Sequence, residues 1–127
     1  MNERKHHILV VDDEAGMREV LQIVLENGGY QVSIAAAVEE AITFLDKHSV
    51  DVVLTDLYMG KDRNAGLKLL EYLQKNQPTT PTLMITAHGT VESAVEAMRL
   101  GALDYIRKPF NSNDEILLRI KRAVKQR

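Results

Sequence analysis

Three carboxylates and one lysine stand directly after short strand-like runs of this chain. They are Asp12 and Asp13 after residues 8–11, Asp56 after residues 50–55, and Lys108 after residues 104–107. If these runs are strands of one parallel sheet, their carboxyl ends share an edge, and residues distant in sequence meet there. Clustered carboxylates repel one another, and a bound divalent cation is the usual remedy. The spacing therefore predicts a site for Mg²⁺, with Mn²⁺ as the alternative ion.

The same residues have the chemistry for phosphoryl transfer. A carboxylate can attack phosphorus and form an acyl phosphate, which gives Asp56 the role of nucleophile. A metal would neutralise the transferring oxygens, and Lys108 adds a flexible point charge suited to one of them. Thr86, which ends another strand-like run, can donate its hydroxyl to a second oxygen. Taken singly, each residue could be structural, so the hypothesis depends on all of them meeting.

Composition limits the classes of protein that the chain can represent. It has 127 residues, 45% of them hydrophobic and 27% charged, which suits a single domain over residues 1–127. The net charge of −2 predicts no direct binding to nucleic acid, and the absence of cysteine excludes disulfides and thiolate chemistry. Because no apolar run reaches membrane-spanning length, we expect a cytoplasmic protein without membrane contact.

Strand and helix signals alternate along the chain. Strand-like runs occupy about residues 7–12, 31–36, 51–55, 82–86 and 104–107, and helical periods occupy residues 15–27, 38–48, 67–73, 91–100 and 113–124. Thr90 is the expected N-cap of the fourth helix, and Asn111 or Ser112 that of the fifth. This alternation predicts an α/β fold, a doubly wound (βα)5 flavodoxin-like sandwich with a five-stranded parallel sheet. Strand order 2-1-3-4-5 would place strands 1 and 3 side by side at the topological switch point.

Four motifs carry a resemblance to a known family. They are Val-Val-Asp-Asp-Glu at 10–14, Leu-Thr-Asp-Leu at 54–57, Ile-Thr-Ala-His-Gly at 85–89 and Asp-Tyr-Ile-Arg-Lys-Pro-Phe at 104–110. In this order and spacing the chain resembles, over essentially its full length, a response-regulator receiver domain of the two-component phosphorelay type. It is most similar to receivers of the nitrogen-regulation class, which usually precede an ATPase domain that activates σ54 RNA polymerase. The last helical pattern has no stop signal, which is compatible with the N-terminal part of a longer regulator.

The resemblance implies a role for each site residue. Asp56 would take the phosphoryl group from a phosphohistidine of a sensor histidine kinase. Asp13 would ligate Mg²⁺ directly and Asp12 mainly through water, with Asp56 and the backbone carbonyl of Tyr58 as further ligands. Thr86 and Lys108 would hold the phosphoryl oxygens, and no organic cofactor is implied.

The resemblance also implies a switch and an output. Tyr105 would move inward as Thr86 is drawn to the phosphate, and small Ala87 leaves room for that motion. The fourth helix, fifth strand and fifth helix would form a surface that controls a homodimer or an effector, such as an ATPase or DNA-binding domain in the same polypeptide. The Lys108–Pro109 peptide is expected to be cis.

Two departures from the family pattern generate hypotheses. Gly60 stands where the family usually has proline, and the helix-starting glycine, Gly66, comes two residues late. We therefore predict a longer loop over 58–65 that is mobile and orders on phosphorylation. Bulky Tyr58 and His88 flank the site, and they would shield an acyl phosphate from water.

Two other functions use similar residues. A phosphatase of the haloacid-dehalogenase type also has an aspartate nucleophile, Mg²⁺ and a lysine, but it needs Asp-x-Asp, and this chain reads Asp56-Leu57-Tyr58. A flavin-binding flavodoxin-like domain needs a hydroxyl- and glycine-rich phosphate loop after the first strand. Residues 12–14 are acidic instead and would repel phosphate without a metal. Both alternatives are therefore weaker than the receiver hypothesis.

Overall fold

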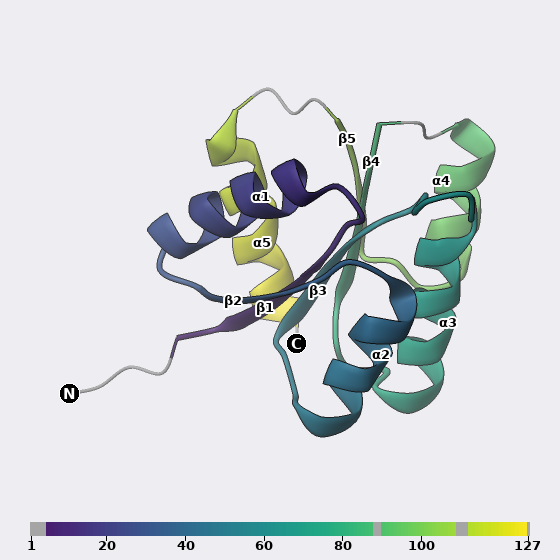
Figure 1. Cartoon of the computed structure of the whole chain (residues 1–127), viewed down its shortest axis with the longest axis horizontal. Helices are drawn as coiled ribbons and strands as arrows, with labels where there is room; N and C mark the ends of the chain where they lie inside the picture. Colours follow the sequence, from purple (N-terminus) through teal and green to yellow (C-terminus); the bar gives the residue numbers. More distant parts are fainter. Residues whose placement is uncertain (1–4, 88–89, 109–111, 127) are drawn as a thin grey trace.

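The computed structural model describes residues 5–87, 90–108 and 112–126. Its centre is a five-stranded parallel sheet in the order β2-β1-β3-β4-β5, as predicted (Figure 1). The strands are β1 (His7–Val11), β2 (Gln31–Ala35), β3 (Val52–Asp56), β4 (Thr82–Thr86) and β5 (Asp104–Arg107). The helices are α1 (Ala15–Asn27), α2 (Val38–Lys47), α3 (Ala65–Asn76), α4 (Val91–Arg99) and α5 (Asn113–Gln126).

Helices cover both faces of the sheet (Figure 1). Helices α1 and α5 pack on one face through Leu21, Leu25, Ile116 and Ile120. Helices α2, α3 and α4 pack on the other face, where their apolar residues meet alternate residues of the same strands. Because successive strand residues point to opposite faces, the central strands β3 and β4 are buried at every position. This arrangement leaves the carboxyl ends of the strands as the accessible edge for a site.

Several element boundaries differ from the predicted ones by one residue. Strand β3 spans 52–56 rather than 51–55, and Ala36 and His48 lie just outside the elements to which the patterns assigned them. Asp51 is not a strand residue here, although its side chain accepts a hydrogen bond from the His7 N–H at 2.7 Å. Asp56 is consequently the last residue of its strand, not the residue after it.

The predicted cap of α4 is confirmed and is reciprocal. The Thr90 hydroxyl accepts the Ser93 N–H at 3.0 Å, and the Ser93 hydroxyl accepts the Thr90 N–H at 2.9 Å. Such a pair satisfies two amide groups that the first helical turn leaves unpaired. At α5, the Ser112 hydroxyl accepts the Glu115 N–H at 3.3 Å, which favours Ser112 over Asn111 as the cap, although Asn111 lies outside the described residues.

Among the described residues, no helix combines the length and the apolar character that crossing a membrane requires.

Candidate functional site

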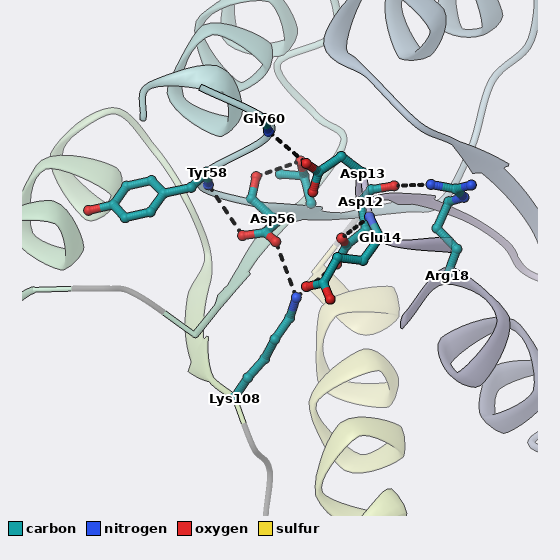
Figure 2. Close-up of polar contacts among 9 residues, drawn as sticks. Asp12, Asp13, Glu14, Arg18, Asp56, Tyr58, Gly60 and Lys108 are labelled. Carbon is teal, nitrogen blue, oxygen red and sulfur yellow. Dashed lines mark hydrogen bonds and ion pairs between the residues drawn. The ribbon is translucent and has the colours of Figure 1, made fainter. Parts of the chain in front are cut away.

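The carboxyl edge of the sheet brings together the three aspartates and the lysine that the sequence singled out (Figure 2). Strand β1 ends at Val11, so Asp12 and Asp13 lie in the turn before α1, beside the last residue of β3, Asp56. One carboxylate oxygen from each of the three aspartates lies within 4.8 Å of the others. Three anionic oxygens at this separation match the hard ligands that Mg²⁺ prefers.

Lys108 lies between two of these carboxylates. Its Nζ donates to Asp12 Oδ2 at 2.8 Å and to Asp56 Oδ2 at 3.1 Å. All three side chains are at least nine-tenths buried. Removing charged groups from water is costly unless they are paired, and the lysine pairs both carboxylates at once. The ammonium group is therefore held against Asp12 and Asp56 by the protein itself.

The environment shifts the pKa values of this pair in the same direction. Burial raises the pKa of Asp56, the nearby Lys108 charge lowers it, and the Asp12 charge raises it again, with a net increase. Burial lowers the pKa of Lys108, but the hydrogen bond to Asp12 and the two negative charges outweigh burial and raise it overall. The lysine is consequently protonated at neutral pH, and burial makes ionisation of Asp56 less favourable than in water.

Main-chain amides donate to a further oxygen of each aspartate. The Tyr58 N–H donates to Asp56 Oδ1 at 3.2 Å, and the Gly60 N–H donates to Asp13 Oδ2 at 2.6 Å (Figure 2). Asp12 Oδ1 accepts the Glu14 N–H at 2.9 Å. Each predicted metal-binding carboxylate is thus oriented by the chain itself. The carbonyl of Tyr58 as a ligand stays a prediction.

Gly66, the glycine expected to start the third helix, lies at the beginning of α3. Gly66 is the second residue of α3, and its N–H donates to the Leu57 carbonyl at 2.9 Å. A Cβ atom at this position would lie 2.4 Å from the Asp56 carbonyl oxygen, so only glycine fits without a shift. The start of α3 therefore packs directly on the backbone at the end of β3.

The loop between β3 and α3 has hydrogen bonds of its own. Met59 and Asp62 exchange two main-chain hydrogen bonds, at 3.1 and 3.0 Å, around a turn in which Gly60 has φ +62°. This conformation is a compact turn, and the predicted mobility of the loop stays a prediction. Ordering on phosphorylation stays a prediction, and any opening of the loop must break these contacts.

The two predicted switch residues lie on neighbouring strands. Thr86 is buried at the end of β4, and its carbonyl accepts the Lys108 N–H at 2.9 Å. Tyr105 is half-buried in β5 and packs against the cluster beneath α4, with its hydroxyl 3.1 Å from the Ser93 hydroxyl. The switch role of both residues stays a prediction. His88 and Pro109, on which two other hypotheses depend, lie outside the described residues.

Sequence reasoning missed three contributors. Arg18 donates from its guanidinium to the Asp12 main-chain carbonyl at 2.6 Å and stabilises the acidic turn (Figure 2). Gly60 acts through its backbone N–H, and Ser93 links the α4 cap to Tyr105. The first two contacts use backbone atoms, which no residue type reveals.

Comparison with known proteins agrees with this geometry. Residues 8–121 match the family described as the response regulator receiver domain. An NtrX-like response regulator of Rickettsia bellii is 38% identical over 116 residues, and the transcriptional regulatory protein FixJ of Bradyrhizobium diazoefficiens is 37% identical over 123 residues. These matches cover 91% and 96% of this chain, but only 24% and 58% of the relatives, so the chain spans part of their length.

Solved structures show the same arrangement of elements. The receiver domain of NtrX from Brucella abortus superposes with a TM-score of 0.86 at 36% identity, covering 93% of this chain and 98% of that domain. A receiver domain protein from Methanospirillum hungatei superposes with a TM-score of 0.89 at 29% identity, covering 97% of this chain and 96% of that protein.

Proposed function

This chain belongs to the response regulator receiver domain family, and from that premise we propose that Asp56 accepts a phosphoryl group from a phosphohistidine of a sensor histidine kinase in the cytoplasm. The observation that carries the proposal is the convergence of Asp12, Asp13 and Asp56 around the buried Lys108. Members of this family are signalling domains, so the chemistry of this one is limited to its own acylation and slow hydrolysis.

In the proposed reaction, an Asp56 carboxylate oxygen attacks phosphorus and forms a P–O bond as the P–N bond to histidine breaks. The histidine nitrogen leaves with the electron pair and takes up a proton. Lys108 Nζ, already 3.1 Å from Asp56 Oδ2, can move to a phosphoryl oxygen without entering from water. Thr86, at the end of the neighbouring strand, is the donor proposed for a second oxygen.

The acidic residues fit a divalent cation. Three carboxylates and one lysine leave an uncompensated charge of −2 at a cluster whose oxygens lie within 4.8 Å of one another. Asp13, Asp56 and the Tyr58 carbonyl are the ligands proposed for Mg²⁺ or Mn²⁺, with Asp12 acting mainly through water. When bound, the ion neutralises the transferring phosphoryl oxygens.

The proposed output is a change at the surface formed by α4, β5 and α5. Val91, Val95 and Met98 recur on one side of α4 and are exposed. Tyr105 lies beneath this helix and contacts it through Ser93. We propose that acylation shifts Tyr105 and α4 between two arrangements, and that this shift controls a homodimer. FixJ is a transcriptional regulator by name, which supports a transcriptional effector as the final target, such as an ATPase or DNA-binding domain.

Intact-mass analysis tests acylation directly. The protein is incubated with acetyl phosphate and Mg²⁺, and we expect one added phosphoryl group on the wild type and none on Asp56→Asn. Asp114→Asn, which removes an exposed aspartate at the start of α5, should be modified like the wild type. Equal modification of wild type and Asp56→Asn, or no modification of either, would overturn the proposal.

Turnover of a generic phosphomonoester separates this function from the phosphatase alternative. A phosphatase needs a second carboxylic acid two residues after its nucleophile, and that position is Tyr58. We expect no sustained release of phosphate.

A further inference from the structure

The loop between β3 and α3 reaches back to a carboxylate of the acidic cluster. In the turn closed by Met59 and Asp62, Gly60 adopts φ +62°, a conformation that most side chains avoid. This conformation directs the Gly60 N–H to Asp13 Oδ2 at 2.6 Å (Figure 2). A hydrogen bond from an amide to an ionised carboxylate is among the stronger ones in proteins.

Other contacts hold this turn in shape. Asp62 Oδ1 accepts the Asn64 N–H at 2.9 Å, and Asp62 Oδ2 accepts the Lys68 ammonium at 2.7 Å. The Met59 side chain is buried in the core cluster beneath α2 and α3. The turn is therefore anchored to the body of the domain, so that it can fix the position of a group that it contacts.

Asp13 is the member of the cluster that most needs such a contact. Asp12 and Asp56 are buried and bound to Lys108, whereas Asp13 is exposed in the turn after β1. An exposed aspartate samples several rotamers, and selecting one of them costs entropy. A carboxylate has two oxygens, so it can accept the Gly60 N–H and bind a cation at the same time.

We propose that the Gly60 main-chain N–H is a positioning group for the metal ligand Asp13, so that cation binding and the fold of the 58–64 loop are thermodynamically linked. The proposal rests on the metal site of the proposed function, and it adds that the 58–64 loop regulates the affinity of that site for the cation. Linkage is reciprocal: a loop conformation that strengthens cation binding is itself stabilised by the cation to the same extent.

Substitutions at Gly60 test this linkage without changing the charge of the site. Nothing lies within 4 Å of a Cβ at this position, so a side chain there strains only the backbone. Gly60→Val places a β-branched residue in the left-handed region, whereas Gly60→Asn keeps a residue that tolerates it. Gly29→Val is the matched control, because Gly29 has φ +96°, open space around it and a place at the far end of α1.

The first readout is the dissociation constant for Mg²⁺, followed by NMR titration of the full chain without a phosphoryl donor. We expect Gly60→Val to bind Mg²⁺ about tenfold more weakly, the effect of losing one hydrogen bond to a charged group. Gly60→Asn and Gly29→Val should stay within about twofold of the wild type, since both keep the amide contact. The second readout is amide exchange, in which Mg²⁺ should slow the exchange of the Gly60 N–H in the wild type.

Four results would overturn the proposal. Gly60→Val could bind Mg²⁺ as well as the wild type, which would mean that the loop and the cation are not linked, or more tightly, which would mean that the loop competes with the cation. Gly60→Val and Gly29→Val could weaken binding equally, which would indicate a loss of global stability. Exchange of the Gly60 N–H could be the same with and without Mg²⁺. If the wild type itself fails to bind Mg²⁺, the metal site fails together with this proposal, an outcome that the first three do not share.

Discussion

Replacing Gly66 with alanine should destabilise the domain, although alanine is the better helix former. The added Cβ would lie 2.4 Å from the Asp56 carbonyl oxygen and 2.9 Å from the Leu57 Cα. Carbon and oxygen atoms rarely approach closer than about 3.3 Å, so α3 or the end of β3 must move by about 1 Å. Both obstacles are backbone atoms, which cannot turn aside as a flexible side chain would.

The magnitude follows from two opposing effects. Overpacking of this kind costs about 1–3 kcal/mol, and the contact with rigid backbone favours the upper part of that range. The gain in helix propensity offsets up to about 1 kcal/mol. We expect the free energy of unfolding to fall by about 2 kcal/mol, which lowers the melting temperature by about 8 °C in a domain of this size.

Gly16→Ala provides the matched control. Gly16 is the second residue of α1, as Gly66 is the second residue of α3, and nothing lies within 4 Å of its added Cβ. Gly16→Ala should therefore stabilise the protein slightly. Thermal and urea unfolding followed by circular dichroism measure both variants, in EDTA so that metal binding does not contribute. The reasoning is refuted if Gly66→Ala is as stable as the wild type, or gains stability as Gly16→Ala does.

Further predictions concern the charged pair and the α4 cap. Lys108→Met should lower the free energy of unfolding by about 3–5 kcal/mol without metal, because the buried Asp12 and Asp56 carboxylates lose the lysine ammonium that pairs them. Urea unfolding measures this loss, and a loss that does not shrink when Mg²⁺ is added would contradict the prediction. Asp56→Asn should stabilise the metal-free protein at neutral pH. Burial raises the pKa of Asp56, so the folded protein favours the protonated carboxyl over the ionised one. The stability that the protonated Asp56 contributes is therefore fully present below the ordinary carboxyl pKa, and it is lost as the pH rises through the pKa of the folded state. The gain should vanish in acid, and urea unfolding across pH would disprove it by showing no gain at pH 7. Ser93→Ala should weaken the start of α4 by about 1 kcal/mol and speed amide exchange there, and unchanged exchange would count against the cap.

The sequence was sufficient to predict the fold because its periodicities are clear and its elements short. The ranges predicted for the first helix, the fourth strand and the fifth strand are those observed for α1, β4 and β5. Boundaries were less certain where a distant group decides them. Asp51, for example, lies outside β3, although its main-chain N–H donates to the His7 carbonyl at 2.7 Å and its side chain accepts the His7 N–H.

The acidic cluster was predictable from topology alone. Parallel strands in this order must bring residues 12, 13 and 56 together, whatever the details of packing. The contacts that orient these carboxylates were not predictable, because the donors at residues 58 and 60 are backbone amides that every residue except proline possesses. The missing proline at position 60 was visible in the sequence. Its consequence, a Gly60 N–H that donates to the Asp13 carboxylate, could be seen only in the three-dimensional structure.

The position of Lys108 would connect the proposed acylation of Asp56 to the proposed output surface. The proposed acylation would replace one charge on Asp56 with about two on the phosphoryl group, so the site would become more negative. A lysine drawn from solvent would have to lose its hydration at that moment, whereas Lys108 is already buried against Asp12 and Asp56. Its own N–H is bonded to the Thr86 carbonyl, and Tyr105 lies three residues before it on β5. If the ammonium shifts toward a phosphoryl oxygen as proposed, it would therefore act first on the β4–β5 edge, the part of the sheet that supports α4.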